Sequence, residues 1–409
     1  MKRVVVTGMG GITALGNDWE TIERGLREKN NAVRRMPEWD YVESLNTRLG
    51  APIDGFRAPS HYPRKMIRSM GRVALLSVCA SEMALADAGL LNDRSLGNGR
   101  AGISYGSSSG SVEPVRVFGR MLDTGSMRDV TSTSYIQMMP HTAAVNIGLF
   151  FGLRGRIIPT SSTCVSGSQG IGYAYEAIRF GRQDIMLAGG SEELSVSGAA
   201  VFDTLFAASC RNDSPELTPR PFDRERDGLV VGEGAATLVL EEYERARARG
   251  AKIHAEIVGF SCNSDGNHVT QPESSTMAIV MRQALEDAGL PASEIGYISA
   301  HGTATDRGDV AESVAAACVF GNRKPLSSMK SYIGHTLGAC GAIEAWWCIE
   351  MLRRKWFAPT LNLTTPDPEC AELDHIVGEG RNIDTEYAAS NNFAFGGINT
   401  SLIFRRFPT

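Results

Sequence analysis

The segment PTSSTCVSGSQGIG, from Pro159 to Gly172, joins a short apolar run to a stretch with helical periodicity. The apolar face of that stretch is formed by Ile171, Ala174, Tyr175 and Ile178. Cys164 is therefore predicted at or near the first turn of a helix, where unpaired backbone N–H groups favour negative charge and lower the pKa of a cysteine. Its neighbours are small, which leaves room for a substrate carbonyl. We interpret Cys164 as a nucleophile, although a packed thiol is the commoner role of a cysteine.

The rest of the chain alternates strand-like and helix-like segments, which indicates an α/β fold. RVVVTG and DIMLAGGSEE are typical of strands, and STMAIVMRQALEDAG is typical of a helix that ends at a glycine. The segments RIIPTSSTCVSGSQGIGYAYEAIRFG and PLSSMKSYIGHTLGACGAIEAWWCIEML each run from a short strand through a turn of small residues into a helix. This similarity predicts two related halves that pack together.

The composition indicates a globular enzyme and excludes several other classes of protein. The 409 residues include 43% hydrophobic and 21% charged side chains, which suits a chain that buries a sizeable core. A net charge of −5 gives no indication of nucleic-acid binding. No apolar run is long enough to span a bilayer or to form a signal-peptide core, so a cytoplasmic enzyme is expected. The eight cysteines are scattered without a C-x-x-C pair, which argues against a disulfide framework and against a metal site.

Three further segments contain residues that could take part in chemistry. In YISAHGTATDRGDVAES, a strand that ends at Ala300 would place His301 at its carboxyl end, where α/β proteins usually bind ligands. In SSMKSYIGHTLGACGAIE, a turn separates Lys330 from His335. In ASNNFAFGGINTSLIF, a Gly-Gly pair before a strand could present backbone N–H groups to a developing oxyanion.

These motifs, in this order along essentially the whole chain, resemble the β-ketoacyl-[acyl-carrier-protein] synthases of the elongating type. RPFDRERDGLVVGEGA, HGTATDRGD, KSYIGHTLGACGAIE and NNFAFGGIN contribute to the resemblance. The family implies a thiolase-like fold, in which two similar halves form αβαβα layers, and a dimer of like or unlike subunits. We expect one ketosynthase domain over residues 1–409, with an N-terminal half at 1–248 and a C-terminal half at 249–409.

The resemblance also implies the chemistry. Cys164 would take an acyl chain from its carrier as a thioester, with the backbone N–H groups of Cys164 and Phe395 as the oxyanion hole. His301 and His335 would hold the thioester carbonyl of a malonyl unit as carbon dioxide leaves, and Lys330 would support them. This decarboxylative Claisen condensation gives a 3-oxoacyl-acyl carrier protein, in the elongation of fatty-acid or of polyene and polyketide chains. No cofactor is expected, because the substrates carry their own 4′-phosphopantetheine.

Binding roles follow from the same resemblance. Thr303 and Thr305 would hydrogen-bond the pantetheine arm, Phe395 would gate the acyl pocket, and Ser109 would stand where a larger apolar residue often bounds the acyl tunnel. A small residue at this place, together with the motifs SSTCVSGSQ and NNFAFGGIN, is similar to the condensing enzymes of aryl-polyene clusters. Ala394 departs from the glycine usual in the family and restricts the backbone of the gate.

The expected partner is an acidic acyl carrier protein. Its docking surface would include Arg64, Lys65, Arg68 and Arg211, although such residues also occur on an ordinary solvated helix face. Other functions remain open at this point. The chain could be a non-catalytic chain-length partner subunit, which generally lacks the cysteine, or a cysteine acyl hydrolase. A thiolase would have a second cysteine where His335 stands.

Overall fold

The computed structural model describes residues 1–408, and its eleven-stranded sheet contains two copies of one strand pattern. The first half contributes β1 (Val4–Thr13), β4 (Ala101–Gly106), β5 (Ile157–Thr160), β6 (Ile185–Glu192) and β8 (Gly234–Glu242). The second half contributes β9 (Ala255–Ser264), β10 (Ile295–Ser299), β11 (Pro325–Ser327), β15 (Tyr387–Ala394) and β16 (Ile398–Arg406), with β13 (Asp374–His375) at the edge.

The strand order is β5-β4-β6-β8-β1 in the first half and β11-β10-β15-β16-β9 in the second, so corresponding strands take the same places. In both halves the first two pairings in these orders are parallel and the last two are antiparallel. The halves join where Val4–Val6 of β1 pairs with Ala255–Ile257 of β9. The prediction of an α/β fold with two related halves is therefore confirmed.

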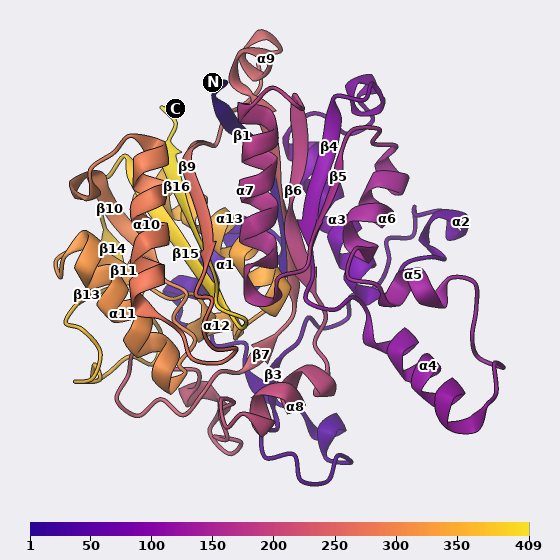
Figure 1. Ribbon diagram of the computed structural model, residues 1–409, viewed down its shortest axis with the longest axis horizontal. Helices are drawn as coiled ribbons and strands as arrows, with labels where there is room; N and C mark the ends of the chain where they lie inside the picture. The colour runs from indigo at the N-terminus through magenta and orange to yellow at the C-terminus, as the bar shows by residue number, and fades with distance from the viewer. Residues whose placement is uncertain (409) are drawn as a thin grey trace.

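Helices form the remaining layers (Figure 1). Between the strands of the two halves lie α7 (Ser166–Arg179) and α13 (Cys340–Arg354), which contact each other and strands of both halves. The outer layer of the first half includes α3 (Arg72–Asp87) and α6 (Thr142–Phe151), and that of the second includes α10 (Ser274–Ala288), with α11 (Asp306–Phe320) packed against α10. Because α13 is packed between strands of both halves, every residue from Cys340 to Leu352 is buried.

Shorter elements surround this framework. The remaining helices are α1 (Trp19–Arg27), α2 (Arg64–Ile67), α4 (Val112–Thr124), α5 (Ser134–Met138), α8 (Val196–Thr204), α9 (Tyr243–Ala248) and α12 (Lys330–Ile333). Small sheets are formed by β2 (Arg34–Arg35), β3 (Leu49–Ala51) and β7 (Val231–Gly232), and by β12 (Trp356–Phe357) with β14 (Arg381–Asn382). Within residues 1–408, no helix has the length and apolar character needed to cross a membrane.

The two central helices begin in the same unusual way. A 3₁₀ turn precedes each of them, η3 (Thr163–Val165) before α7 and η6 (Leu337–Ala339) before α13. The first residue of each turn is left-handed, with φ of 48° at Thr163 and 46° at Leu337. A left-handed backbone is costly for residues other than glycine, so the surrounding packing must hold both turns in place.

Glycines let the starts of these helices approach closely. A Cβ added at Gly167 of α7 would lie 2.8 Å from the backbone nitrogen of Ala342, and one added at Gly341 of α13 would lie 2.7 Å from that of Ser168. Each glycine is the third residue after the centre of its 3₁₀ turn. The duplicated strand–turn–helix unit therefore brings the reactive turns of both halves together.

Candidate active site

Cys164 lies at the centre of the 3₁₀ turn that leads into α7, and only 5% of its surface is exposed. The backbone N–H groups of Cys164 and Phe395 lie within hydrogen-bonding reach of its sulfur. The Thr163 hydroxyl donates a hydrogen bond of 3.2 Å to the Phe395 carbonyl, which ties the Phe395 loop to this turn. The two segments expected to form an oxyanion hole therefore lie next to each other.

Burial decides the protonation of the Cys164 thiol. It raises the pKa of Cys164 to about 11, although the Lys330 charge and the two backbone N–H groups act in the opposite direction. The expectation of a lowered pKa at the helix start is therefore wrong. Its physical reason is that removal from water disfavours the thiolate more than the nearby donors stabilise it.

His301 and His335 present one ring nitrogen each toward this sulfur. An atom of each ring and the Cys164 sulfur all lie within 4.8 Å of one another, and the ring centroids are 5.3 Å apart. Nδ1 of His301 lies 3.1 Å from the Lys330 ammonium, and Nδ1 of His335 accepts the Leu337 N–H at 3.2 Å. Because each Nδ1 faces a donor, the ring proton of the neutral imidazole lies on Nε2.

Burial and the charge of Lys330 together keep both rings neutral. Burial and the nearby Lys330 ammonium hold the pKa of His301 and that of His335 well below the ordinary value. Although burial lowers it, the pKa of Lys330 is raised overall, and the Glu344 carboxylate beside its ammonium contributes to this rise. The site therefore contains two neutral N–H donors beside one permanent cation.

Lys330 belongs to a small buried network. Its ammonium lies 2.5 Å from Glu344 Oε1, and Asn392 donates a hydrogen bond of 2.6 Å to Glu344 Oε2. The Cys340 thiol donates to the Cys164 carbonyl over 3.1 Å. These residues come from α12, α13 and β15, so three elements of the C-terminal half support a cysteine of the N-terminal half.

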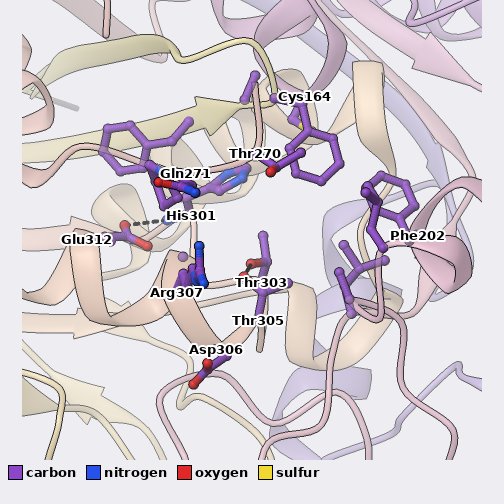
Figure 2. A pocket seen from close by; sticks show the side chains of 18 of the residues that line it. Cys164, Phe202, Thr270, Gln271, His301, Thr303, Thr305, Asp306, Arg307 and Glu312 are labelled. Atoms are coloured by element: carbon purple, nitrogen blue, oxygen red, sulfur yellow. Dashed lines mark hydrogen bonds between the residues drawn. The ribbon is translucent and has the colours of Figure 1, made fainter. Parts of the chain in front are cut away.

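Two positioning carboxyl groups were missed by the sequence analysis. Glu312 accepts the backbone N–H groups of His301 and Gly302, each at 2.7 Å, and Figure 2 shows it beside His301. Asp309 accepts those of Thr303 and Ala304, at 3.0 and 3.2 Å. Both carboxyls are buried on α11, which follows this loop. A usable signal was present in DRGDVAE, where two acids spaced i, i+3 follow the glycine turn.

A cavity of about 550 Å³ opens onto the cysteine. Its walls include Cys164, both histidines, Thr303, Thr305 and Phe395, several of which are labelled in Figure 2. The Thr303 and Thr305 hydroxyls lie 2.8 Å apart. Phe395 stacks on Phe202 with ring centroids 5.3 Å apart.

Other predicted site residues lie outside this cavity. Ser109 is exposed in the loop after β4, and it is not part of the described cavity wall, so its tunnel role stays a prediction. Arg64, Lys65 and Arg68 are exposed at α2, and their side chains form no hydrogen bond or ion pair within residues 1–408. Arg211 is instead paired with Asp227 at 3.4 Å.

The donor atoms of Cys164, His301 and His335 also form a set that could hold a metal ion. The Lys330 ammonium, 3.1 Å from Nδ1 of His301, places a positive charge beside that set. Such a charge opposes the binding of a second cation.

Comparisons with known proteins identify the family. The family model for Beta-ketoacyl synthase, N-terminal domain, matches residues 1–246, and that for Beta-ketoacyl synthase, C-terminal domain, matches residues 254–364. The chain is 37% identical to 3-oxoacyl-[acyl-carrier-protein] synthase 2 of Vibrio cholerae, over 99% of both chains.

Solved structures agree with this assignment. A β-ketoacyl synthase from Burkholderia phymatum is 69% identical, with a TM-score of 0.99 over the whole of both chains. The ishigamide ketosynthase/chain length factor is 31% identical, with a TM-score of 0.90 over the whole of both chains. The thiolase-like fold is thereby confirmed, and the chain belongs to the β-ketoacyl synthase family.

Proposed function

We propose that this protein is a 3-oxoacyl-[acyl-carrier-protein] synthase that joins an acyl group to a malonyl unit with loss of carbon dioxide. The observation that carries this proposal is the arrangement of one sulfur and two neutral imidazoles within 4.8 Å. A nucleophile that can be acylated thus stands beside two N–H donors that suit a developing enolate. The relative from Vibrio cholerae carries the same activity in its name.

In the first half-reaction, the Cys164 sulfur attacks the thioester of the acyl donor. The N–H groups of Cys164 and Phe395 stabilise the oxyanion, and a lost donor of this kind typically costs about a hundred- to a thousandfold in rate. The C–S bond to pantetheine breaks, and the departing pantetheine thiolate takes up the proton of the Cys164 thiol, so the exchange is neutral overall. Thr303 and Thr305, on the cavity wall, hydrogen-bond the pantetheine arm.

In the second half-reaction, Nε2–H of His301 and of His335 hold the thioester carbonyl of the malonyl unit. The electron pair of the bond to carbon dioxide forms the enolate, which attacks the acyl group on Cys164. The Cys164 sulfur leaves as a thiolate and takes up one proton from solvent, which restores the thiol. Lys330 acts on the enolate through His301 Nδ1, 3.1 Å away. Because these steps need no oxidant or electron sink, the proposed chemistry requires neither a metal nor an organic cofactor.

The test mixes the protein with acyl and malonyl carriers and measures carbon dioxide and 3-oxoacyl product. Both are expected from the native protein, and Cys164→Ala is expected to abolish acyl transfer. Cys210→Ala, which removes an exposed thiol, is the matched control. Free fatty acid without carbon dioxide would instead favour the hydrolase, and no turnover would favour the non-catalytic subunit.

An acidic carrier protein would dock on Arg64, Lys65 and Arg68, whose charges have no partner within the described residues. Reversal of charge at Arg64 and Lys65 is expected to raise the apparent KM for the acyl carrier with little change in kcat. An unchanged KM would remove this docking surface. Arg211, paired with Asp227, is expected to contribute less.

The pathway, assembly and compartment are finer parts of the proposal. The motifs SSTCVSGSQ and NNFAFGGIN, with the small Ser109, are the basis for proposing an aryl-polyene pathway, and fatty-acid elongation is the alternative. Product analysis tests this, since saturated chains alone would contradict the aryl-polyene pathway. A dimer with a like or related subunit is supported by the ketosynthase/chain length factor relative.

We propose that residues 1–248 form the N-terminal half of the domain and residues 249–409 the C-terminal half. All eight cysteines are unpaired, which supports the cytoplasm.

A further inference from the structure

The wall of the active-site cavity contains one cation without a partner. Arg307, the second residue of α11, lines the cavity and is exposed to solvent. Among residues 1–408 its guanidinium has no carboxylate within ion-pair distance and makes no hydrogen bond. In Figure 2 it lies with Thr303 and Thr305 on the same wall of the cavity.

The other arginine of the cavity wall is already neutralised. The side chain of Arg226 is only 3% exposed and forms ion pairs with Asp306 and Asp367. It also donates to the backbone carbonyls of Asp223 and Thr305. Arg226 is therefore a structural clamp between the loop before α11 and its neighbours, and it offers no charge to a ligand.

The carboxyl groups of the cavity wall are also engaged. Asp306 pairs with Arg226 at 3.4 Å, and Asp227 pairs with Arg211 at 3.4 Å. Asp265 accepts a hydrogen bond of 2.7 Å from Asn399. Glu312 accepts two backbone N–H groups at 2.7 Å. Arg307 thus presents a positive charge that forms no ion pair with any carboxyl group of the described wall.

We propose that Arg307 binds the phosphate of the 4′-phosphopantetheine arm and so makes the enzyme prefer phosphorylated thioester donors. This inference rests on the proposed function, which supplies the substrate class. A guanidinium binds phosphate oxygens in a fork and remains charged at every relevant pH. Arg307 follows Thr305 by two residues, so the threonines would hold the amides of the arm and Arg307 its anionic end.

The experiment compares acyl-4′-phosphopantetheine with acyl-pantetheine as donors that lack the carrier protein. The readout is the kcat/KM of Cys164 acylation for each donor, expressed as a ratio. The native protein is expected to favour the phosphorylated donor by about tenfold or more at low salt, and Arg307→Gln to bring the ratio near one. Arg307→Lys should give an intermediate ratio, because an ammonium keeps the charge but not the fork.

Arg247→Gln is the matched control, because Arg247 is an exposed arginine on α9, outside the cavity wall. It should keep the native ratio. A ratio that is the same in the native protein and in Arg307→Gln would overturn the inference.

Binding of 4′-phosphopantetheine, measured by isothermal titration calorimetry, separates this inference from the proposed function. A Kd that rises about tenfold in Arg307→Gln supports Arg307 as the phosphate ligand even if Cys164 is never acylated. An unchanged Kd overturns it. Failure of both donors to acylate Cys164 would refute the proposed function alone.

Discussion

Replacement of Gly341 by alanine tests whether the close contact of the two central helices creates the active site. The added Cβ would lie 2.7 Å from the backbone nitrogen of Ser168, below any ordinary contact distance. A backbone atom cannot change rotamer, so α7 and α13 must separate. Relief of the contact needs a shift of about 0.7 Å, and that shift would move Cys164, in the turn that leads into α7, away from His335, which precedes α13.

Two effects of opposite sign set the magnitude. Alanine favours a helix over glycine by about 1 kcal/mol, whereas overpacking in a well-packed core costs about 1–3 kcal/mol. Because the contact at Gly341 is with backbone, we expect overpacking to prevail and the free energy of unfolding to fall by about 1–2 kcal/mol. A misplacement on the order of 1 Å can cost roughly a hundredfold in rate, so the condensation rate should fall by more than the stability.

The assay combines urea unfolding with the rate of malonyl decarboxylation on acyl-loaded protein. Gly119→Ala is the matched control, because Gly119 also lies inside a helix, α4, but a Cβ there meets no atom within 4 Å. It should raise the free energy of unfolding by up to about 1 kcal/mol. If Gly341→Ala were as stable as Gly119→Ala and decarboxylated at the native rate, the helix contact would not create the site.

Three further predictions concern the buried network. Glu344→Leu leaves the Lys330 charge unpaired and should lower the free energy of unfolding by about 3–5 kcal/mol in urea titrations; a loss below about 1 kcal/mol would argue against a charged pair. Because the pKa values of His301 and His335 are lowered, both rings should stay neutral and decarboxylation should hold its rate from about pH 7.5 to 6; a fall with an apparent pKa of about 6.5 would contradict this. Cys340→Ala removes the donor to the Cys164 carbonyl and should slow acylation about fivefold, as followed by mass spectrometry, whereas an unchanged rate would make that contact incidental.

Periodic segments were predicted well from the sequence. The stretch typical of a helix, STMAIVMRQALEDAG, forms α10 from Ser274 to Ala288, and the strand expected to end at Ala300 ends at Ser299. The first strand was predicted too short, because RVVVTG continues through GMGGIT to Thr13. Glycines let this part of β1 pack closely against α3, since a Cβ at Gly8 would lie 2.2 Å from the Ala84 carbonyl of α3.

The main residues of the site were predicted correctly, but the pKa shift of Cys164 and the supporting carboxyl groups were not. His301, Lys330 and His335 were found because each stands at a turn between regular segments. The burial of Cys164 depends on how both halves close around it, which no local pattern records, and so the direction of its pKa shift was wrong. Glu312 was missed for a similar reason, because an acid on a helix is usually solvated and only tertiary packing brings it under the His301 loop.

The Lys330 charge assists both the acylation step and the decarboxylation step. Acylation needs a thiolate at Cys164, and decarboxylation needs neutral N–H donors at His301 and His335. A cation nearby lowers the pKa of all three groups, so one charge favours both required states. A buried carboxylate such as Glu344 would have the opposite effect on these groups if it stood alone. Glu344 contacts the ammonium itself, 2.5 Å away, and therefore stabilises the cation on which both steps depend.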